Sequence, residues 1–254
     1  MARTLRISTD RGVSDLIGFI LMFSIIAGSV SIIYLVGFDT LEDFSDNEDL
    51  ETADRAMRGV AESFEDIHRQ GAPARSIDVG VGGANLDLLD SSLQIEVNGS
   101  SGSKLERTVT TNALVIQQEG APQAVAYESG ALFRTGDAGS IVRHRPVFNC
   151  GEDAAILSVV RLRGSISISV DDPVQITGRR TETSRLHPQP GASPKATNIT
   201  LDVSDSRYSE AWTGYLDRVG TEDEGWTEQS EGVYRCDVDR VYVRQTTIEI
   251  EAVN

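Results

Sequence analysis

The sequence predicts an α+β fold in which one long N-terminal helix precedes a mainly antiparallel β domain. Three patterns in the 254 residues predict it: an uncharged apolar run, an acidic stretch whose apolar residues recur every three or four positions, and, beyond Pro73, short runs in which apolar and polar residues alternate. Helices repeat every 3.6 residues and strands every two. The first two patterns therefore indicate helix and the third indicates strands.

The apolar run, LIGFILMFSIIAGSVSIIYLVGF at residues 16–38, contains no charged side chain. As a helix it is about 34 Å long, enough to cross a hydrocarbon core about 30 Å thick. A buried helix of a soluble protein is the alternative, but such helices rarely keep so many positions uncharged. We therefore expect a transmembrane helix over residues 13–38, with the lipid bilayer as its partner. Ser24 and Gly28 form a small-xxx-small pair, which allows a close helix contact but is also common in membrane helices.

The charges that flank this run predict its orientation. Arg3, Arg6 and Arg11 precede it, and seven acidic residues follow between positions 39 and 51. Arginines remain on the cytoplasmic side, so we expect a single-pass protein of the cell membrane with a cytoplasmic N-terminus and an extracellular C-terminal domain. A cleaved secretory signal usually has an apolar region of only about 7–15 residues. The segment is therefore expected to be retained.

Residues 39–72 predict an acidic amphipathic stalk helix. Residues 39–70 hold 11 acidic residues and three arginines, a net charge of −8 and half of the protein's −16. The apolar positions lie three or four residues apart, on one helix face: they are Leu50, Ala53, Met57, Val60, Phe64 and Ile67. This stripe is too short for a sustained coiled coil with other subunits, so we favour packing on the following domain. Gly71 and Pro73 are expected to stop the helix.

Residues 73–254 predict an extracellular, mostly β domain, since the alternating runs are bounded by Gly, Asn, Asp and Pro. The expected strands are residues 76–81, 92–97, 105–110, 113–118, 154–162, 165–170, 197–203, 239–245 and 247–253. Trp212, Tyr215 and Val219 have helical spacing and predict a short helix near residues 206–219. The Pro-, Thr- and Arg-rich segment 179–195 predicts an exposed loop.

Charge excludes some classes of function. With 39 acidic and 23 basic residues the chain repels phosphate backbones, so nucleic acid is not an expected partner. Only Lys104 and Lys195 are lysines, and the other 21 basic residues are arginines. Such a composition resembles the proteins of salt-loving archaea, whose acidic surfaces stay hydrated while salt screens their repulsion.

The junction before the apolar run reads DRGVSDLIGF at residues 10–19. It resembles the class III signal of archaeal type IV pilin-like proteins, a short basic leader that ends in a glycine just before a hydrophobic helix. The resemblance implies that a prepilin peptidase removes residues 1–12 by cutting between Gly12 and Val13. It also implies a pilin-like sheet as the alternative to a sandwich, and other pilin-like subunits as partners through the apolar helix. Asp15 and Ile17 depart from the pattern, which usually has proline or, in bacteria, glutamate there, so polymerisation is less certain than processing.

Most of the chain also resembles a family of uncharacterised haloarchaeal membrane proteins with this pilin-like start. The matching stretches include DIHRQGAP at residues 66–73 and GALFR at residues 130–134. This resemblance implies an archaeal, halophilic membrane protein but no activity.

Few side chains are candidates for chemistry. Cys150 and Cys236 would lie outside the membrane, where a disulfide can persist, and two buried free thiols are the alternative. Asn98 and Asn198 begin Asn-x-Ser/Thr sequons and permit N-glycosylation. His68, His144 and His187 lack ligand-spaced partners, with His68 expected on the helix surface. Trp212 and Trp226 are expected in core or interface packing rather than on a sugar-binding platform.

The sequence therefore predicts no catalytic, cofactor-binding or metal-binding residues and no cofactor, and we expect no enzyme. Two functional hypotheses remain. One is a pilin-like surface protein, a minor subunit of a type IV pilus-like assembly. The other is a single-pass surface domain that never polymerises and serves envelope structure or recognition.

Overall fold

The computed structural model describes residues 10–99, 102, 104–118, 120–136, 139–223 and 225–253. Within the helices, the side chains of residues 10–15, 32–47, 49 and 221–223 are outside this description. Residues 1–9 of the predicted leader, and the side chains of residues 32–38 of the predicted membrane helix, therefore lie outside the described residues. The chain divides into two compact units, Met1–Glu48 and Asp49–Asn254.

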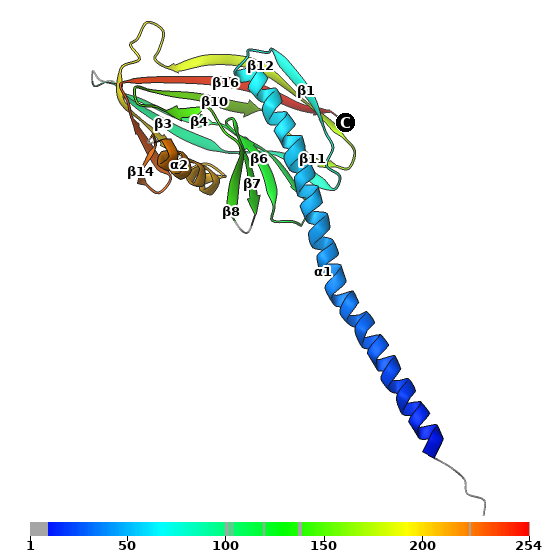
Figure 1. Cartoon of the computed structure of the whole chain (residues 1–254). Coiled ribbons are helices and arrows are strands. Elements are labelled where there is room, and N and C mark those ends of the chain that lie inside the picture. The colour runs from blue at the N-terminus through cyan, green and yellow to red at the C-terminus, as the bar shows by residue number, and fades with distance from the viewer. Residues whose placement is uncertain are drawn as a thin grey trace, which may run out of the picture. The chain divides into compact units, whose positions relative to one another are not determined.

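The long helix α1 covers Asp10–His68 (Figure 1). In its first part every described side chain of residues 16–31 is exposed. The hydroxyls of Ser29 and Ser31 donate to the carbonyls of Ile26 and Ala27, at 2.9 and 2.8 Å. Among the helical residues with described side chains, no stretch is long and apolar enough to cross a membrane.

The end of α1 follows the prediction. Gly71 adopts a positive φ of 81°, and the amide of Ala72 donates to the carbonyl of Asp66 at 3.1 Å. This hydrogen bond reaches back across Gly71, whose left-handed conformation is one in which helices commonly end and which glycine adopts without a Cβ penalty. The predicted stop at Gly71 is therefore confirmed.

The Asp49–Asn254 unit contains three sheets and one further helix, α2 (Ser209–Asp223). The first sheet has the strand order β1 (Ala74–Val79), β12 (Val174–His187), β16 (Arg240–Val253), β10 (Ala154–Arg163) and β9 (Phe148–Cys150). The second has β11 (Ser167–Val170), β2 (Ala84–Leu89), β5 (Ala113–Gln118), β6 (Ala124–Glu128), β7 (Ala131–Gly136) and β8 (Gly139–His144). The third has β14 (Thr227–Ser230), β15 (Val233–Asp237), β13 (Ala196–Asp202), β3 (Ser92–Gly99) and β4 (Lys104–Thr110). Only β10 and β16 pair in parallel among the named strands, so the prediction of a mainly antiparallel α+β fold is confirmed.

Two large apolar clusters and a small one around Val115 form the core of this unit. In one large cluster, the stripe of α1 packs against strands of the first and second sheets. The other large cluster joins the first and third sheets to α2 and contains Trp212 and Trp226. All six stripe residues are buried, at no more than 7% exposure, and Phe64 packs edge-on against Tyr127 with ring centroids 5.3 Å apart. The stripe is thus core of its own domain, as predicted, and both tryptophans are core residues.

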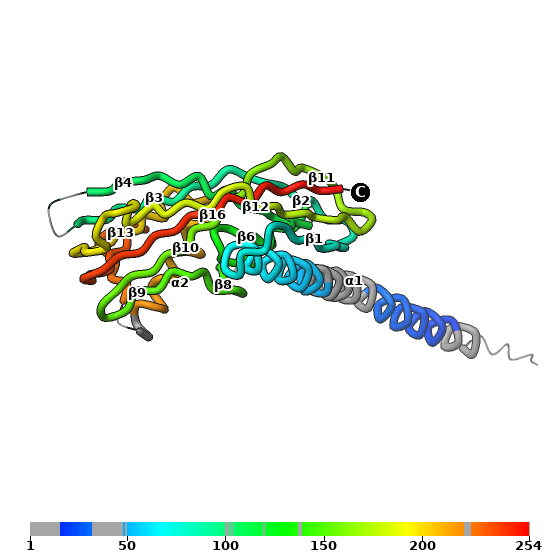
Figure 2. The backbone as a smooth tube through the Cα atoms, turned by 90° about the horizontal axis from the view of Figure 1, so that it is seen from above, coloured from blue at the N-terminus to red at the C-terminus, as the bar shows by residue number. Residues whose placement is uncertain are grey.

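Two predictions near the C-terminus are wrong. Residues 239–245 and 247–253 form one strand, β16, rather than two, because the junction at Thr246 and Thr247 is β-branched and contains no turn residue. Residues 179–187, predicted as loop, belong to β12, which pairs with β16 along its whole length. The predicted loop is correct only for the residues after His187. Figure 2 shows β16 (red) beside β12 and β10.

Helix α1 covers only part of one face of the first sheet. On β16 the side chains of Ile248 and Ile250 are buried in the cluster with α1, whereas Tyr242, on the same face by the two-residue period, is exposed. On β10 the same change occurs between Val160, which is buried against α1, and Ile156, which is exposed. The remainder of the face is left open near the end of the helix, and it positions the candidate site.

Candidate functional site

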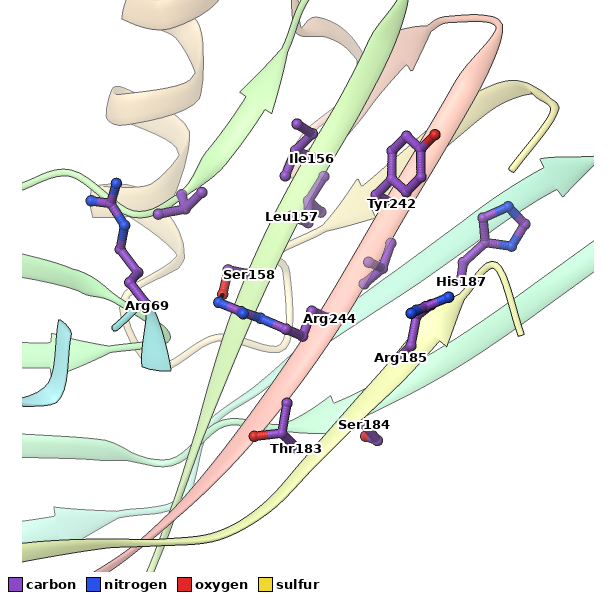
Figure 3. A pocket seen from close by; sticks show the side chains of 12 residues that line it. Arg69, Ile156, Leu157, Ser158, Thr183, Ser184, Arg185, His187, Tyr242 and Arg244 are labelled. Atoms are coloured by element: carbon purple, nitrogen blue, oxygen red, sulfur yellow. Dashed lines mark hydrogen bonds between the residues drawn. The ribbon is translucent and has the colours of Figure 1, made fainter. Parts of the chain in front are cut away.

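A pocket of about 530 Å³ occupies the open part of this face (Figure 3). Ser158 of β10 and Arg244 of β16 lie on its floor, Arg185 and His187 of β12 border one side, and Arg69 lies just after the end of α1. The full lining is Arg69, Val147, Ile156, Leu157, Ser158, Thr183, Ser184, Arg185, His187, Tyr242, Val243 and Arg244. It contains three arginines and no acidic residue, although the protein's net charge is −16.

Arg244 connects the sheet to the end of the helix. One guanidinium nitrogen donates to the carbonyl of His68 at 2.5 Å and to Ser158 Oγ at 3.3 Å. The last carbonyls of a helix have no intrahelical donor and carry the negative end of the helix dipole, so a cation is favourable there. Arg244 therefore has a structural role, and its positive charge remains in the pocket because no described carboxylate pairs with it.

Arg185 stands directly opposite Arg244 in the antiparallel pairing of β12 with β16. Directly opposed side chains share one face of a sheet, with Cβ atoms about 4.5–5.5 Å apart, and like charges there are destabilising. Arg185 is exposed and forms no hydrogen bond or ion pair with any residue that the structure describes. The two arginines are thus opposed at the sheet, but the Arg244 guanidinium is directed towards β10 and the end of α1, and the Arg185 guanidinium is left exposed at the side of the pocket (Figure 3).

Beneath the pocket, His68 is buried at 5% exposure, which corrects the prediction that it lies on the helix surface. Its Nδ1 lies 3.4 Å from Ser158 Oγ. Burial, reinforced by the charge of Arg244, lowers the pKa of His68 to about 4. The ring is therefore neutral near pH 7 and acts as a packed polar contact.

The outer walls offer apolar and polar surface. Tyr242 and Ile156, paired across β16 and β10, are 39% and 47% exposed. Nε2 of His187 is buried and has no hydrogen-bond partner within the described part of the chain. Burial lowers the pKa of His187, so this nitrogen belongs to a neutral ring that can donate or accept, depending on the tautomer. Such a site can hold an anion by its arginines and a ring by its apolar wall.

A second buried polar centre is structural. Glu128, at the end of β6, is fully buried and accepts hydrogen bonds from three hydroxyls, Ser91, Thr111 and Ser206, each at 2.7 Å, and from Trp212 Nε1 at 3.0 Å. These donors come from four separate segments. With all its partners inside the protein and no surface of its own, Glu128 joins the segments and is not placed to meet a ligand.

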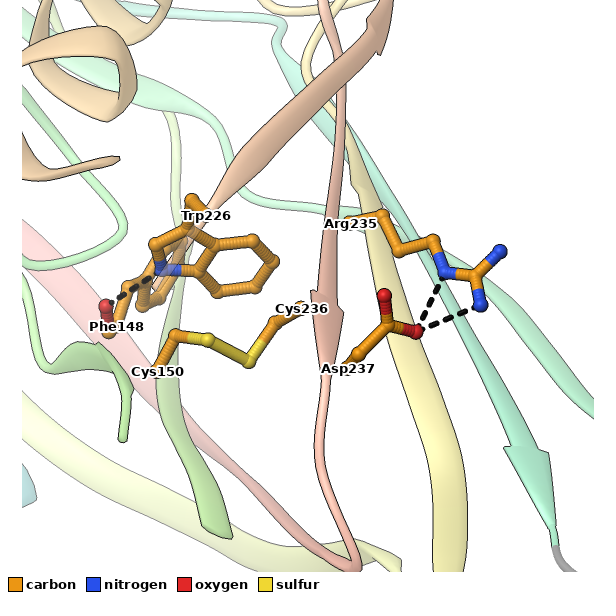
Figure 4. The surroundings of a disulfide bond; sticks show 6 residues. All are labelled: Phe148, Cys150, Trp226, Arg235, Cys236 and Asp237. Carbon is orange, nitrogen blue, oxygen red and sulfur yellow. Dashed lines mark hydrogen bonds and ion pairs between the residues drawn. A yellow bond between two sulfur atoms is a disulfide. The ribbon is translucent and has the colours of Figure 1, made fainter. Parts of the chain in front are cut away.

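The two cysteines, left open between a bridge and free thiols, form a disulfide with a Cα–Cα distance of 6.0 Å (Figure 4). Cys150 ends β9 of the first sheet, and Cys236 belongs to β15 of the third. Trp226 lies beside the bridge and donates from Nε1 to the carbonyl of Phe148 at 3.1 Å. The disulfide therefore links two sheets whose strands are far apart in sequence.

The two sequon asparagines lie side by side in the third sheet. Asn98 Nδ2 donates to Asn198 Oδ1 at 2.9 Å across the β3–β13 pair. Asn198 is buried at 7% exposure, and its own amide nitrogen donates to Thr197 Oγ1. A glycan on Asn198 would have to displace these contacts, whereas Asn98 is half-buried at the end of its strand. The side chains of the processing pair, Gly12 and Val13, lie outside the described residues.

Sequence reasoning missed the pocket. Arg240, Tyr242 and Arg244 alternate with the buried Val241 and Val243, so the open face of β16 could have been found from this pattern. Arg185 could not, because its position depends on β12 continuing through a segment that composition assigns to a loop. Nothing in the local sequence indicates that these two strands place Arg185 opposite Arg244.

Comparison with known proteins gives one match. Residues 11–251 match DUF7289, described as a family of unknown function. No curated protein and no solved structure is similar to the chain.

Proposed function

Because the chain belongs to the DUF7289 family, whose function is unknown, we propose its role from its own chemistry. The protein is a pilin-like, membrane-anchored protein of the cell surface. It crosses the cell membrane once, with the N-terminus in the cytoplasm and the β domain outside. Its origin is a halophilic archaeon, in keeping with its arginine-rich, strongly acidic composition.

The apolar side chains of the first part of α1 carry this proposal. Ten large apolar residues between Leu16 and Val30 are each more than half exposed, and Phe19, Met22, Phe23 and Ile25 exceed 60%. A soluble protein rarely exposes apolar surface on this scale, and transfer of such surface out of water is strongly favourable. The hydroxyls of Ser29 and Ser31 donate to the helix's own carbonyls, so these two groups carry no unsatisfied donor into lipid.

The β domain has features that suit the outside of the cell. A disulfide persists in oxidising compartments and is rare in the cytosol. The excess of acidic residues keeps the surface hydrated at high salt. The positive-inside rule gives the same orientation independently, from the arginines of the leader.

Resemblance to the class III signal adds processing. Prepilin peptidase cuts between Gly12 and Val13, and the apolar helix then becomes the N-terminus of the mature chain. In this proposal the protein is a minor subunit that joins other pilin-like subunits through the apolar helix. Outside the bilayer, the apolar surface of this helix can be covered only by the apolar helices of other subunits.

The alternative proposal is a single-pass surface domain that does not polymerise. It is favoured by Ile17, which stands where bacterial pilins carry glutamate at the fifth mature position. The stripe of α1 is also already buried in its own domain and cannot contribute to contacts between subunits. Only the apolar part of the helix remains for assembly.

The proposal is tested by the intact mass of the protein extracted from membranes of cells with and without prepilin peptidase. We expect a chain that begins at Val13 only when the peptidase is present, and Gly12→Leu should block the cut. An N-terminus at Met1 or Ala2 in both strains would remove the pilin-like part of the proposal. Recovery of the full-length chain from the soluble fraction without detergent would contradict the membrane anchor. Sheared surface fractions that contain the mature chain would favour assembly over the alternative.

A further inference from the structure

The pocket at the end of α1 contains an exposed arginine, Arg185, with no hydrogen-bond or ion-pair partner among the described residues, and a second arginine, Arg244, opposite it in the sheet register. We propose that the pocket binds an organic oxyanion, a carboxylate or phosphate group carried on a sugar-sized ring, with Arg185 and Arg244 holding the anion and Tyr242 contacting the ring. The inference concerns only the Asp49–Asn254 unit and does not depend on the membrane anchor or on polymerisation.

The register of the sheet provides the first argument. Arg185 and Arg244 are directly opposed on neighbouring antiparallel strands, where like charges repel and destabilise the sheet. The Arg244 guanidinium is held towards β10 and the end of α1, so an oxyanion would bind its remaining donors while the exposed Arg185 side chain closes over the anion. The hydrogen bonds so formed are charge-assisted and about twice as strong as neutral ones. Guanidinium groups offer two parallel donors each and therefore match the paired oxygens of carboxylate and phosphate groups.

The surrounding charges provide the second argument. The pocket lining has no acidic residue, so neither arginine is neutralised there. The two acidic residues in the last turn of α1 are already engaged: Glu65 pairs with Arg69 and lies 3.3 Å from His144 Nε2, and Asp66 pairs with Arg75. Arg244 contacts a helix-end carbonyl and a hydroxyl, so no described carboxylate neutralises it. The protein has 39 acidic residues, so most of its surface repels anions. The positive charge of this pocket is the opposite of that and favours an anionic ligand.

The shape and walls of the pocket define the rest of the ligand. A volume of about 530 Å³ is within the range of small-molecule sites, about 300–1,000 Å³, and far exceeds what an inorganic anion needs. Tyr242 and Ile156 present exposed apolar surface next to the arginines, and an aromatic face of this kind stacks well on a ring. The partnerless Nε2 of His187 can hydrogen-bond a hydroxyl group of that ring.

Isothermal titration tests the ligand class on the full-length protein in a non-ionic detergent, at constant ionic strength. The probes are glucuronate, glucose 6-phosphate, glucose and acetate. We expect both ring anions to bind, acetate to bind at least tenfold more weakly than glucuronate, and glucose not to bind. Binding by glucose as strong as by glucuronate, or no binding by either ring anion, would overturn the proposal.

The arginine pair is tested by Arg185→Gln, with Arg107→Gln as the matched control. Arg107 is an exposed arginine of β4 in the third sheet. We expect Arg185→Gln to weaken glucuronate binding at least tenfold and Arg107→Gln to leave it unchanged. Equal binding by both variants would show that the opposed pair does not hold the anion.

Thermal unfolding without ligand gives a readout that a purely structural arginine would not produce. Arg185→Gln removes the like-charge opposition, so the ligand-free variant should melt at a higher temperature than the wild type. A lower melting temperature would mean that Arg185 stabilises the sheet on its own, and would contradict the proposal.

The variant Tyr242→Ala tests the contact with the ring of the ligand separately from the contact with the anion. It should weaken glucuronate binding several-fold while acetate binding does not change. If it leaves glucuronate binding unchanged, the ring contact is wrong.

Discussion

The two parts of helix α1 differ in where their apolar side chains lie. Between Leu16 and Ser31 every described side chain is exposed, and the large apolar residues point in all directions around the helix. Between Leu50 and Ile67 the apolar residues are confined to one stripe, and the β domain buries that stripe completely. The second part therefore gains its stability within the chain, whereas the first has apolar surface that only an external partner can cover.

This contrast shows why helix periodicity is as informative as total apolar content. The second part has a far higher charge density than the first, yet it contains the residues most important to the domain's core. Its charged positions face away from the core, and Asp54, which does not, is compensated by Arg143 and Arg58, each at 2.7 Å. Although burial alone would raise the pKa of Asp54, these two guanidinium groups hold it below its usual value.

The largest effect expected from this contrast is a difference in unfolding free energy between two matched side-chain truncations. Phe64→Ala removes a fully buried ring that packs on Tyr127 and should destabilise the β domain by about 3–5 kcal/mol. Phe23→Ala removes an exposed ring of the first part and should change the same free energy by less than about 0.5 kcal/mol. Trp212 and Trp226, the only tryptophans, are both core residues of the β domain, so denaturant unfolding followed by their fluorescence measures the difference. Similar losses in both variants would mean that the first part also stabilises the domain.

Reduction of the disulfide should have an effect of similar size, confined to the second unit. The bridge joins residues 86 positions apart, and a loop of that size corresponds to about 4.6 kcal/mol in the chain-entropy description. The Cys150→Ser/Cys236→Ser variant should lose this amount, and a reducing agent should shift the wild type but not the variant. An unchanged unfolding midpoint of the wild type under reducing conditions would contradict the prediction.

Acidification should weaken the junction between helix and sheet at His68. The pKa of His68 is about 4 in the folded protein and about 6.5 in an unfolded chain, so the unfolded chain binds more protons between these values. The stabilisation is fully present above pH 6.5 and is lost as the pH falls towards 4, about 2 kcal/mol between pH 7 and pH 5. Denaturant unfolding at both pH values measures this loss, and His68→Gln should reduce it.

His187, whose pKa is also lowered by burial, contributes to the pH dependence with the same sign. The test is therefore the difference between wild type and His68→Gln, rather than the total slope. Identical slopes for wild type and His68→Gln would contradict the assignment to His68.

The smallest effect concerns two helical glycines. A Cβ on Gly28 meets nothing within 4 Å, whereas a Cβ on Gly59 would lie 2.5 Å from Cδ1 of Ile77. Alanine improves helix propensity by up to about 1 kcal/mol, and in Gly59→Ala the displacement of Ile77 should offset that gain. Gly28→Ala should leave the unfolding of the β domain unchanged. The double variant Gly59→Ala/Ile77→Val should be more stable than Ile77→Val alone. If it is not, the contact with Ile77 is not what prevents alanine at position 59 from stabilising the helix.

The sequence predicts the elements whose periodicity reflects one covered face. The stripe of α1 and its glycine stop are of this kind, and β5 agrees with its prediction at both ends. Strand β6 was missed because all five of its residues are buried, so it has no alternation to detect. The candidate site was missed for a different reason: it exists where α1 ends over the first sheet, and it depends on a pairing between residues 185 and 244 that only the folded chain establishes.

Strand β16 has a consequence for how the protein is made. It covers Arg240–Val253 and follows all the other strands in sequence, yet it occupies the middle of its sheet and contributes to both large apolar clusters. A nascent chain that stops before Arg240 has β10 and β12 with no strand to join them, so neither cluster can close. The β domain therefore completes its folding only after the ribosome has passed residue 253. Until then the β domain remains unfolded, and an unfolded chain can pass through a translocation channel.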